Sequence, residues 1–206
     1  MQDFARALLA FTLLAVTACQ SPQPEIRSSL TSTAQLTTRA PVDIALLPVQ
    51  DATDTKALAT LMPRMRDEAA RGLVARAYSP LAFPLIDRAL PVEATTGGLR
   101  AVDPAYQKTL SNRWNEDAIL GIRVTRFETS ALQSTGWVQF AADVLLTDSK
   151  NGDTLWAGPV EGRVKSGGLG PAPLDPTERL RDASAQVVKE ILLLMPSRPM
   201  VPATAR

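Results

Sequence analysis

Residues 137–165, WVQFAADVLLTDSKNGDTLWAGPVEGRVK, contain the pattern that decides the fold. Between residues 138 and 146 apolar side chains recur at every second position, which is typical of a strand with one buried face. Asn151 and Gly152 form a dipeptide that favours a tight hairpin turn. Residues 155–164 then predict a partner strand. The stretch therefore predicts a long antiparallel β-hairpin.

Segments before the hairpin extend the sheet and add helices. Residues 42–49 (VDIALLPV) are almost continuously apolar, as in a strand that is buried on both faces. Residues 61–73 carry apolar side chains at helical spacing, with Pro63 tolerated in the first turn. Residues 81–86 predict a short, proline-interrupted edge strand. Residues 118–127 predict a further alternating strand.

Two helix starts are marked by an aspartate followed by proline, at Asp103-Pro104 and at Asp175-Pro176. Glu178 completes a capping box at the second start. The predicted order is β-α-β-α-β-β-β-α. This order indicates the α/β (α+β) class: a single domain with a mixed β-sheet of about four to five strands and packed helices.

The N-terminus has the features of an export signal. An apolar run over residues 7–16 has the length of a signal-peptide core and is too short to span a bilayer. Val16-Thr17-Ala18-Cys19 follows it and resembles the bacterial lipobox, in which a branched apolar residue and two small residues precede a cysteine. The alternatives are a plain secretory signal and a buried cytosolic cysteine.

The lipobox resemblance implies that residues 1–18 are a lipoprotein signal peptide and that Cys19 is acylated after cleavage. Two or three acyl chains would hold the protein on a membrane essentially permanently. Gln20 replaces the aspartate that commonly retains such proteins in the inner membrane. We therefore expect an outer-membrane anchor that faces the periplasm, with the inner membrane as the alternative.

Composition sets the expected domain boundaries. The start of the mature chain is rich in Ser, Thr, Gln and Pro, and it holds few large apolar residues that could offset the cost of ordering. Residues 19–41 are therefore predicted to be a lipid-anchored flexible linker. Residues 42–196 form the expected α/β domain, and the proline-rich residues 197–206 are predicted to be a disordered tail.

Three stretches together resemble an uncharacterised family of bacterial lipoproteins. They are residues 44–55 (IALLPVQDATDT), 117–124 (DAILGIRV) and 148–158 (DSKNGDTLWAG). The resemblance implies a fold like that of the curli secretion lipoprotein, the Pel polysaccharide secretion lipoprotein and the lipoprotein activators of penicillin-binding proteins. It implies fold and location more strongly than any activity.

The composition argues against several classes of function. The chain has no histidine and one cysteine, so it lacks the commonest general base and metal ligand and cannot form a thiolate cluster. A net charge of +1 and an aromatic share of 5% argue against nucleic-acid binding. We predict no catalytic, cofactor-binding or metal-binding residue, which leaves Cys19 as the predicted functional residue.

Weaker candidates for chemistry have simpler structural explanations. Asp51 and Asp54 follow the first strand near a sheet edge, and they are the carboxylate pair best placed for acid–base work. The glycines of residues 167–170 lack the Lys-Ser/Thr of a phosphate loop and are expected to form an ordinary loop. Ser166 and Ser184 have no histidine that could activate them.

These observations predict a membrane-anchored periplasmic lipoprotein that is not an enzyme. It would act as an accessory or assembly component of an envelope complex, in secretion or cell-wall maintenance. The expected partners are the membrane, reached through acylated Cys19, and either further copies of the chain or another envelope protein. A carboxylate-based enzyme acting on envelope glycans and a carrier of small ligands or lipids are the alternatives.

Overall fold

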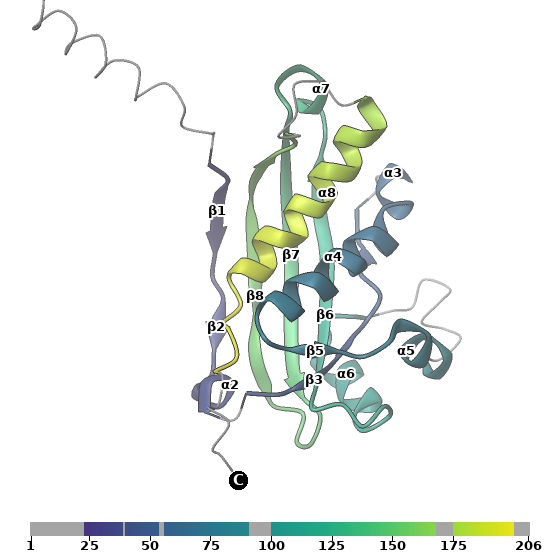
Figure 1. Cartoon of the computed structure of the whole chain (residues 1–206), viewed down its shortest axis with the longest axis vertical. Coiled ribbons are helices and arrows are strands. Elements are labelled where there is room, and N and C mark those ends of the chain that lie inside the picture. Colours follow the sequence, from purple (N-terminus) through teal and green to yellow (C-terminus); the bar gives the residue numbers. More distant parts are fainter. Residues whose placement is uncertain (1–22, 39, 54–55, 91–99, 168–174, 200–206) are drawn as a thin grey trace, which may run out of the picture.

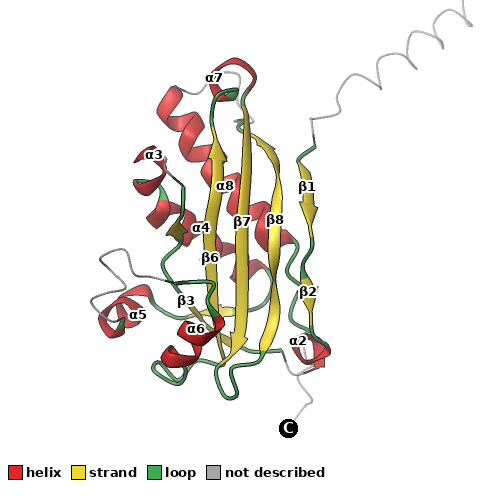
Figure 2. Ribbon diagram, turned by 180° about the vertical axis from the view of Figure 1, so that it is seen from behind, coloured by secondary structure: helices red, strands yellow, loops and turns green. Residues whose placement is uncertain are grey.

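The computed structural model describes residues 23–38, 40–53, 56–90, 100–167 and 175–199. The expected signal peptide and Cys19 lie outside these residues. The described chain forms one sheet with helices on both faces (Figures 1 and 2). Its elements are β1 (Glu25–Ser28), β2 (Thr31–Ser32), α2 (Ala34–Thr38), β3 (Asp43–Leu46), β4 (Gln50–Asp51), α3 (Lys56–Ala59), α4 (Met62–Ala75), β5 (Ser79–Pro80), α5 (Phe83–Ala89), α6 (Pro104–Leu110), β6 (Ala118–Glu128), α7 (Leu132–Thr135), β7 (Trp137–Asp148), β8 (Thr154–Lys165) and α8 (Pro176–Leu193).

The sheet is mixed, which confirms the predicted fold class. Its strand order is β1-β8-β7-β6-β3-β5, with β2 beside β8 and β4 beside β6. The strands β6, β7, β8 and β1 are antiparallel neighbours, whereas β3 runs parallel to both β5 and β6. The eight strands exceed the four to five that the sequence predicted, because short edge segments add to the long strands.

The hairpin of β7 and β8 forms as predicted. Its register runs from Trp137 opposite Lys165 to Thr147 opposite Thr154. The turn between the strands places Gly152 at φ 76°, in the left-handed region that glycine adopts without strain. The amide of Gly152 donates to the carbonyl of Asp148 over 2.9 Å. Together β6, β7 and β8 form the long centre of the sheet (Figure 1).

Helices α4 and α8 pack side by side across one face of the sheet (Figure 1). The α8 start is the predicted capping box: the Asp175 carboxylate accepts from the amide of Glu178, and the Glu178 side chain accepts from the amide of Asp175. Pro63 lies in the first turn of α4, where the sequence placed it. The apolar stripes of both helices join the inward side chains of β6, β7 and β8 in the main core.

The opposite face is covered at one end only, by α5 and α6 (Figure 2). Residues 81–86 were predicted to be an edge strand, and this prediction is wrong, because α5 occupies most of them. Pro84 sits in the first turn of α5, where its missing N–H is harmless. The edge strand β5 consists of Ser79 and Pro80 alone. Residues of α5 and α6 enclose a second, smaller apolar cluster against β3 and β6.

The expected flexible linker is wrong for residues 25–38, which are part of the folded sheet. Both β1 and β2 pair with β8, and α2 follows them. The few apolar residues of this segment are well placed: Leu36 is 1% exposed, and Ile26 and Leu30 pack against the main core. Residues 25–38 therefore belong to the same folded unit as the strands that follow residue 42.

The first residues of the expected disordered tail are also held by the fold. The Arg76 guanidinium donates to the hydroxyl of Ser197 over 3.3 Å. The amide of Arg198 donates to the carbonyl of Arg76 over 2.9 Å. The tail prediction is therefore wrong at its start, whereas residues 200–206 lie outside the described residues.

Candidate functional site

Of the predicted carboxylate pair, Asp51 and Asp54, the structure describes Asp51 alone. The Asp51 carboxylate accepts hydrogen bonds from the amide and the hydroxyl of Thr53, over 2.8 and 2.7 Å. This is an Asx-type turn at the end of β4, and it gives Asp51 a structural role. Asp54 lies outside the described residues, as does the predicted lipidation site, Cys19.

Gly167 and Ser184 have ordinary hydrogen bonds, whereas the Ser166 hydroxyl does not. The amide of Gly167 donates to the Asp182 carboxylate over 3.1 Å, whereas residues 168–170 lie outside the described residues. The hydroxyl of Ser184 donates to the carbonyl of Arg181 over 2.8 Å, within α8. The buried Ser166 hydroxyl has no hydrogen-bond partner in the structure.

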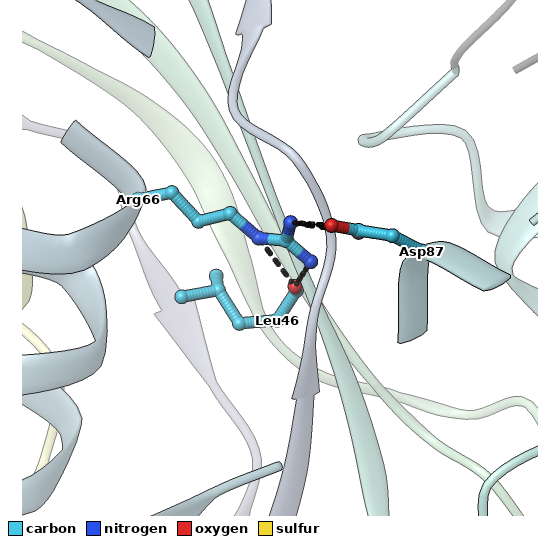
Figure 3. Close-up of polar contacts among 3 residues, drawn as sticks. All are labelled: Leu46, Arg66 and Asp87. Carbon is cyan, nitrogen blue, oxygen red and sulfur yellow. Dashed lines mark hydrogen bonds and ion pairs between the residues drawn. The ribbon is translucent and has the colours of Figure 1, made fainter. Parts of the chain in front are cut away.

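One buried charge ties the two helical layers together around the edge of the sheet. Arg66, 6% exposed, reaches from α4 past β3 to Asp87 of α5 (Figure 3). Its Nε and Nη2 atoms donate to the carbonyl of Leu46 over 3.1 and 2.8 Å, and its Nη1 atom donates to both Asp87 oxygens over 2.7 and 3.0 Å. The guanidinium also lies over the ring of Phe83, 4.1 Å from its centroid.

The position of Arg66 explains its hydrogen bonds. Leu46 pairs with Leu120 of β6 on one side, but β5 is too short to reach it on the other side, and there the guanidinium takes the place of a strand. Burial lowers the pKa of the Arg66 side chain, and the hydrogen bond and charge of Asp87 counteract this effect. The arrangement is a structural clamp. The clamp could not be predicted from the sequence, because arginine in a helix normally indicates a solvent-facing position.

The uncovered half of the second sheet face is a charged surface, which we call the open face. It consists of outward side chains of β1, β6, β7 and β8 (Figure 2). Its ion pairs cross between strands: Arg123 contacts Asp143 over 2.7 Å, and Arg126 contacts Glu161 over 3.6 Å. Arg163 pairs with Glu25 of β1 and lies over the Trp137 ring, 4.8 Å from its centroid.

Two open hollows of about 310 and 380 Å³ lie along this face. Both are lined by Arg27 and Glu161. The smaller hollow adds mainly charged and polar residues, whereas the larger one also has the apolar residues Ala141, Pro159 and Val160 in its lining. Arg27 differs from the other arginines of the face, since it has no ion-pair partner among the described residues.

Within the described residues, no three or more His, Cys, Asp or Glu side chains gather where they could hold a metal ion. In the same residues, no helix combines the length and apolar character needed to cross a bilayer.

No protein-family model matches the chain, and no curated protein matches it either. Solved structures do match. Lipoprotein GNA1162 from Neisseria meningitidis is 21% identical, and the match covers 73% of this chain and 98% of that one at a TM-score of 0.45. The PelC dodecamer from Paraburkholderia phytofirmans is 17% identical, and the match covers 82% of this chain and 98% of that one at a TM-score of 0.42. The hypothetical protein CT253 from Chlamydia trachomatis is 11% identical, and the match covers 74% of this chain and 94% of that one at a TM-score of 0.45. At these TM-scores the similarities carry no conclusion about function.

Proposed function

We propose that this protein is a lipoprotein of the bacterial envelope, anchored through Cys19, that works by binding other proteins and not by catalysis. The observation that carries the proposal is the sequence Val16-Thr17-Ala18-Cys19 at the end of an apolar run of signal-peptide length. In this arrangement the sulfur of Cys19 receives the lipid, and the chain before it is removed.

The fold supports an anchor that keeps the domain close to the bilayer. Five residues, 20–24, lie between Cys19 and Glu25, where β1 begins. An extended chain covers at most about 3.6 Å per residue, so Glu25 stays within about 20 Å of the anchor. A linker over residues 19–41 would have allowed several times that reach. The domain is therefore proposed to act next to the membrane that holds it.

The open face supports a role in protein contact. It is a broad surface whose charges are fixed by strand pairing, and electrostatic complementarity of this kind selects partners and orients them. The proposed role is that of an accessory or assembly component in secretion or cell-wall maintenance. Cross-linking in intact cells followed by mass spectrometry should recover a reproducible set of envelope proteins with the wild type. Reversing the charges of the open face should remove these proteins from the cross-linked set.

Mass spectrometry of the native N-terminus tests the anchor. We expect a mature chain that begins at an acylated Cys19. A Cys19→Ser variant should carry no lipid and should keep its signal peptide. A native chain that still begins at Met1 and remains in the soluble fraction would refute the proposal. Changing Gln20→Asp in the otherwise native chain tests the location, since we expect this variant to move from the outer to the inner membrane fraction.

A further inference from the structure

The outer edge of the sheet is a row of unpaired backbone groups along β1 and β2. Both strands keep one register against β8, so residues 25–33 run as a single edge. The amides of Ser29 and Thr33 donate to β8 carbonyls over 3.2 and 3.0 Å. Because antiparallel pairing alternates, the backbone groups of Ile26 and Ser28 point away from β8. In the described chain, no strand lies beyond β1.

The charges on this edge are arranged to attract a copy of themselves. Natural edge strands are often protected by charges, lysine above all, that repel an approaching strand. In β1, Glu25 and Arg27 lie two residues apart on the open face and have opposite signs. Arg27 has no ion-pair partner among the residues that the structure describes. An antiparallel second β1 centred on Ile26 would therefore place opposite charges against each other at two positions.

We propose that a second copy of this chain pairs with the first through β1, with a two-fold axis beside Ile26. The two Ile26 residues would exchange both backbone hydrogen bonds, and Glu25 would face the partner's Arg27 on each side of the axis. A two-fold contact is self-complementary, as this pattern requires. A shift that centred the contact on Arg27 would bring two arginines together, so the charges also select the register.

This pairing is compatible with two anchors in one membrane. In the proposed register the two Glu25 residues are two positions apart along the strand and one strand apart across it, about 8 Å in all. Each Cys19 is within about 20 Å of its own Glu25, so both lipids can enter the same bilayer. This step rests on the proposed function. A short edge gives a weak contact in solution, and confinement to a membrane raises its effective concentration.

A cysteine added to the full chain, whose own Cys19 is acylated under the proposed function, tests the register. In a pair centred on residue 26, the two Cα atoms of an Ile26→Cys variant would lie about 5.5 Å apart, within disulfide range, whereas those of Ser28→Cys would lie about 14 Å apart. We expect mild oxidation of native membranes to cross-link the Ile26→Cys protein into dimers and to leave Ser28→Cys and the wild type monomeric. Absence of the Ile26→Cys dimer, or equal cross-linking at both positions, would overturn the proposal.

Removing one positive charge from the edge tests the contact energetically. Arg27→Gln should weaken dimerisation of the purified, detergent-solubilised chain roughly three- to tenfold, because two cross-strand charge pairs are lost. Arg123→Gln is the matched control, since it removes the same charge from the same face on β6, where its partner is Asp143 and not a residue opposite Arg27. We expect it to leave the dimer affinity unchanged. Equal effects of the two substitutions would contradict the proposal.

Failure of the dimer can be separated from failure of the anchor. Acylation of Cys19 is measured by mass spectrometry on the same samples. An acylated chain that never cross-links at residue 26 refutes the dimer and leaves the anchor intact. An unacylated chain that does cross-link at residue 26 in concentrated detergent solution refutes the anchor and supports the dimer.

Discussion

The two faces of the central strands differ, although alternate residues of the same strands form them. Along β7, Val138 and Phe140 point towards α4 and α8 and are fully buried, whereas the intervening Gln139 is exposed on the open face. Packing on the first face fixes the register of every strand, because a slip of one residue would bury the charges. Stability is therefore concentrated on the helix-covered face, which leaves the charges of the open face available for contact.

The boundary between covered and open parts of the second face is sharp. On β7, Asp143 is partly exposed and pairs with Arg123, whereas Leu145, two residues further, is buried beneath α6. Gln107 of α6 closes the covered part: its side-chain amide donates to the carbonyls of Ala101 and Leu145 over 2.6 and 3.2 Å. Substitutions in the covered part should therefore cost far more stability than substitutions in the open part.

The largest effect is expected at Gly121, beneath the covered part. A Cβ atom there would lie 1.6 Å from the carbonyl oxygen of Ala101, which is backbone and cannot turn aside. Gly121→Ala should lower the free energy of unfolding by about 3 kcal/mol or more, measured by urea denaturation. Gly167→Ala is the control, because nothing lies within 4 Å of its Cβ position, and its effect should stay within about 0.5 kcal/mol. Similar losses in the two variants would contradict the close approach at Gly121.

The next largest effect is expected at Arg66, which joins the helices of the two faces. Arg66→Met leaves the carbonyl of Leu46 without its donor, so the free energy of unfolding should fall by about 2–4 kcal/mol. Arg71→Met is the matched control on the same helix. Its ion pair with Glu68 is exposed, so the loss should be below about 0.5 kcal/mol. An Arg66 variant as stable as the Arg71 variant would show that the clamp contributes nothing.

A smaller effect, with a distinct dependence on pH, is expected at Tyr78, which holds the chain after α8. Removing its hydrogen bond to Pro196 in Tyr78→Phe should cost about 1 kcal/mol at neutral pH. Burial raises the pKa of the Tyr78 hydroxyl above its ordinary value of 10.0. The unfolded chain therefore loses this proton first, and wild-type stability falls as the pH rises above 10.

The Tyr78→Phe protein lacks this titration, so the difference in stability between the two proteins should narrow above pH 10. Urea denaturation at pH 7 to 11 provides the measurement. A constant difference across that range would mean that the hydroxyl is not desolvated in the fold.

Much of the fold could be predicted because its determinants are local. The hairpin of β7 and β8 has strict alternation, and α8 has a complete capping box beside an apolar stripe. The edge strand β1 could not be predicted, because its position depends on distant residues. A Cβ at Gly162 would lie 2.2 Å from the carbonyl oxygen of Glu25, so β1 needs a bare backbone in β8 to pack against. Nothing near Glu25 in the sequence indicates that glycine.

The candidate site could be predicted less well than the fold. The lipobox is a local signal that predicts Cys19 as the lipidation site, and this residue lies outside the described part of the chain. The open face is a product of strand register, since its charges come from four strands that become neighbours only when the sheet forms. Arg123 and Asp143, for example, are directly opposed only once β6 and β7 are aligned.

The smallest effect is expected on the open face itself, at the pair of Arg123 and Asp143. Their side chains are 39% and 33% exposed, so water screens the charges and competes for the hydrogen bond. Arg123→Gln and Asp143→Asn should each cost below about 1 kcal/mol, and a double-mutant cycle should give a coupling of roughly 0.2–1 kcal/mol that declines with added salt. A coupling above about 2 kcal/mol that salt does not weaken would mean that the pair is shielded from water. The open face would then contribute to stability as the covered face does, and its charges would no longer be free to orient a partner.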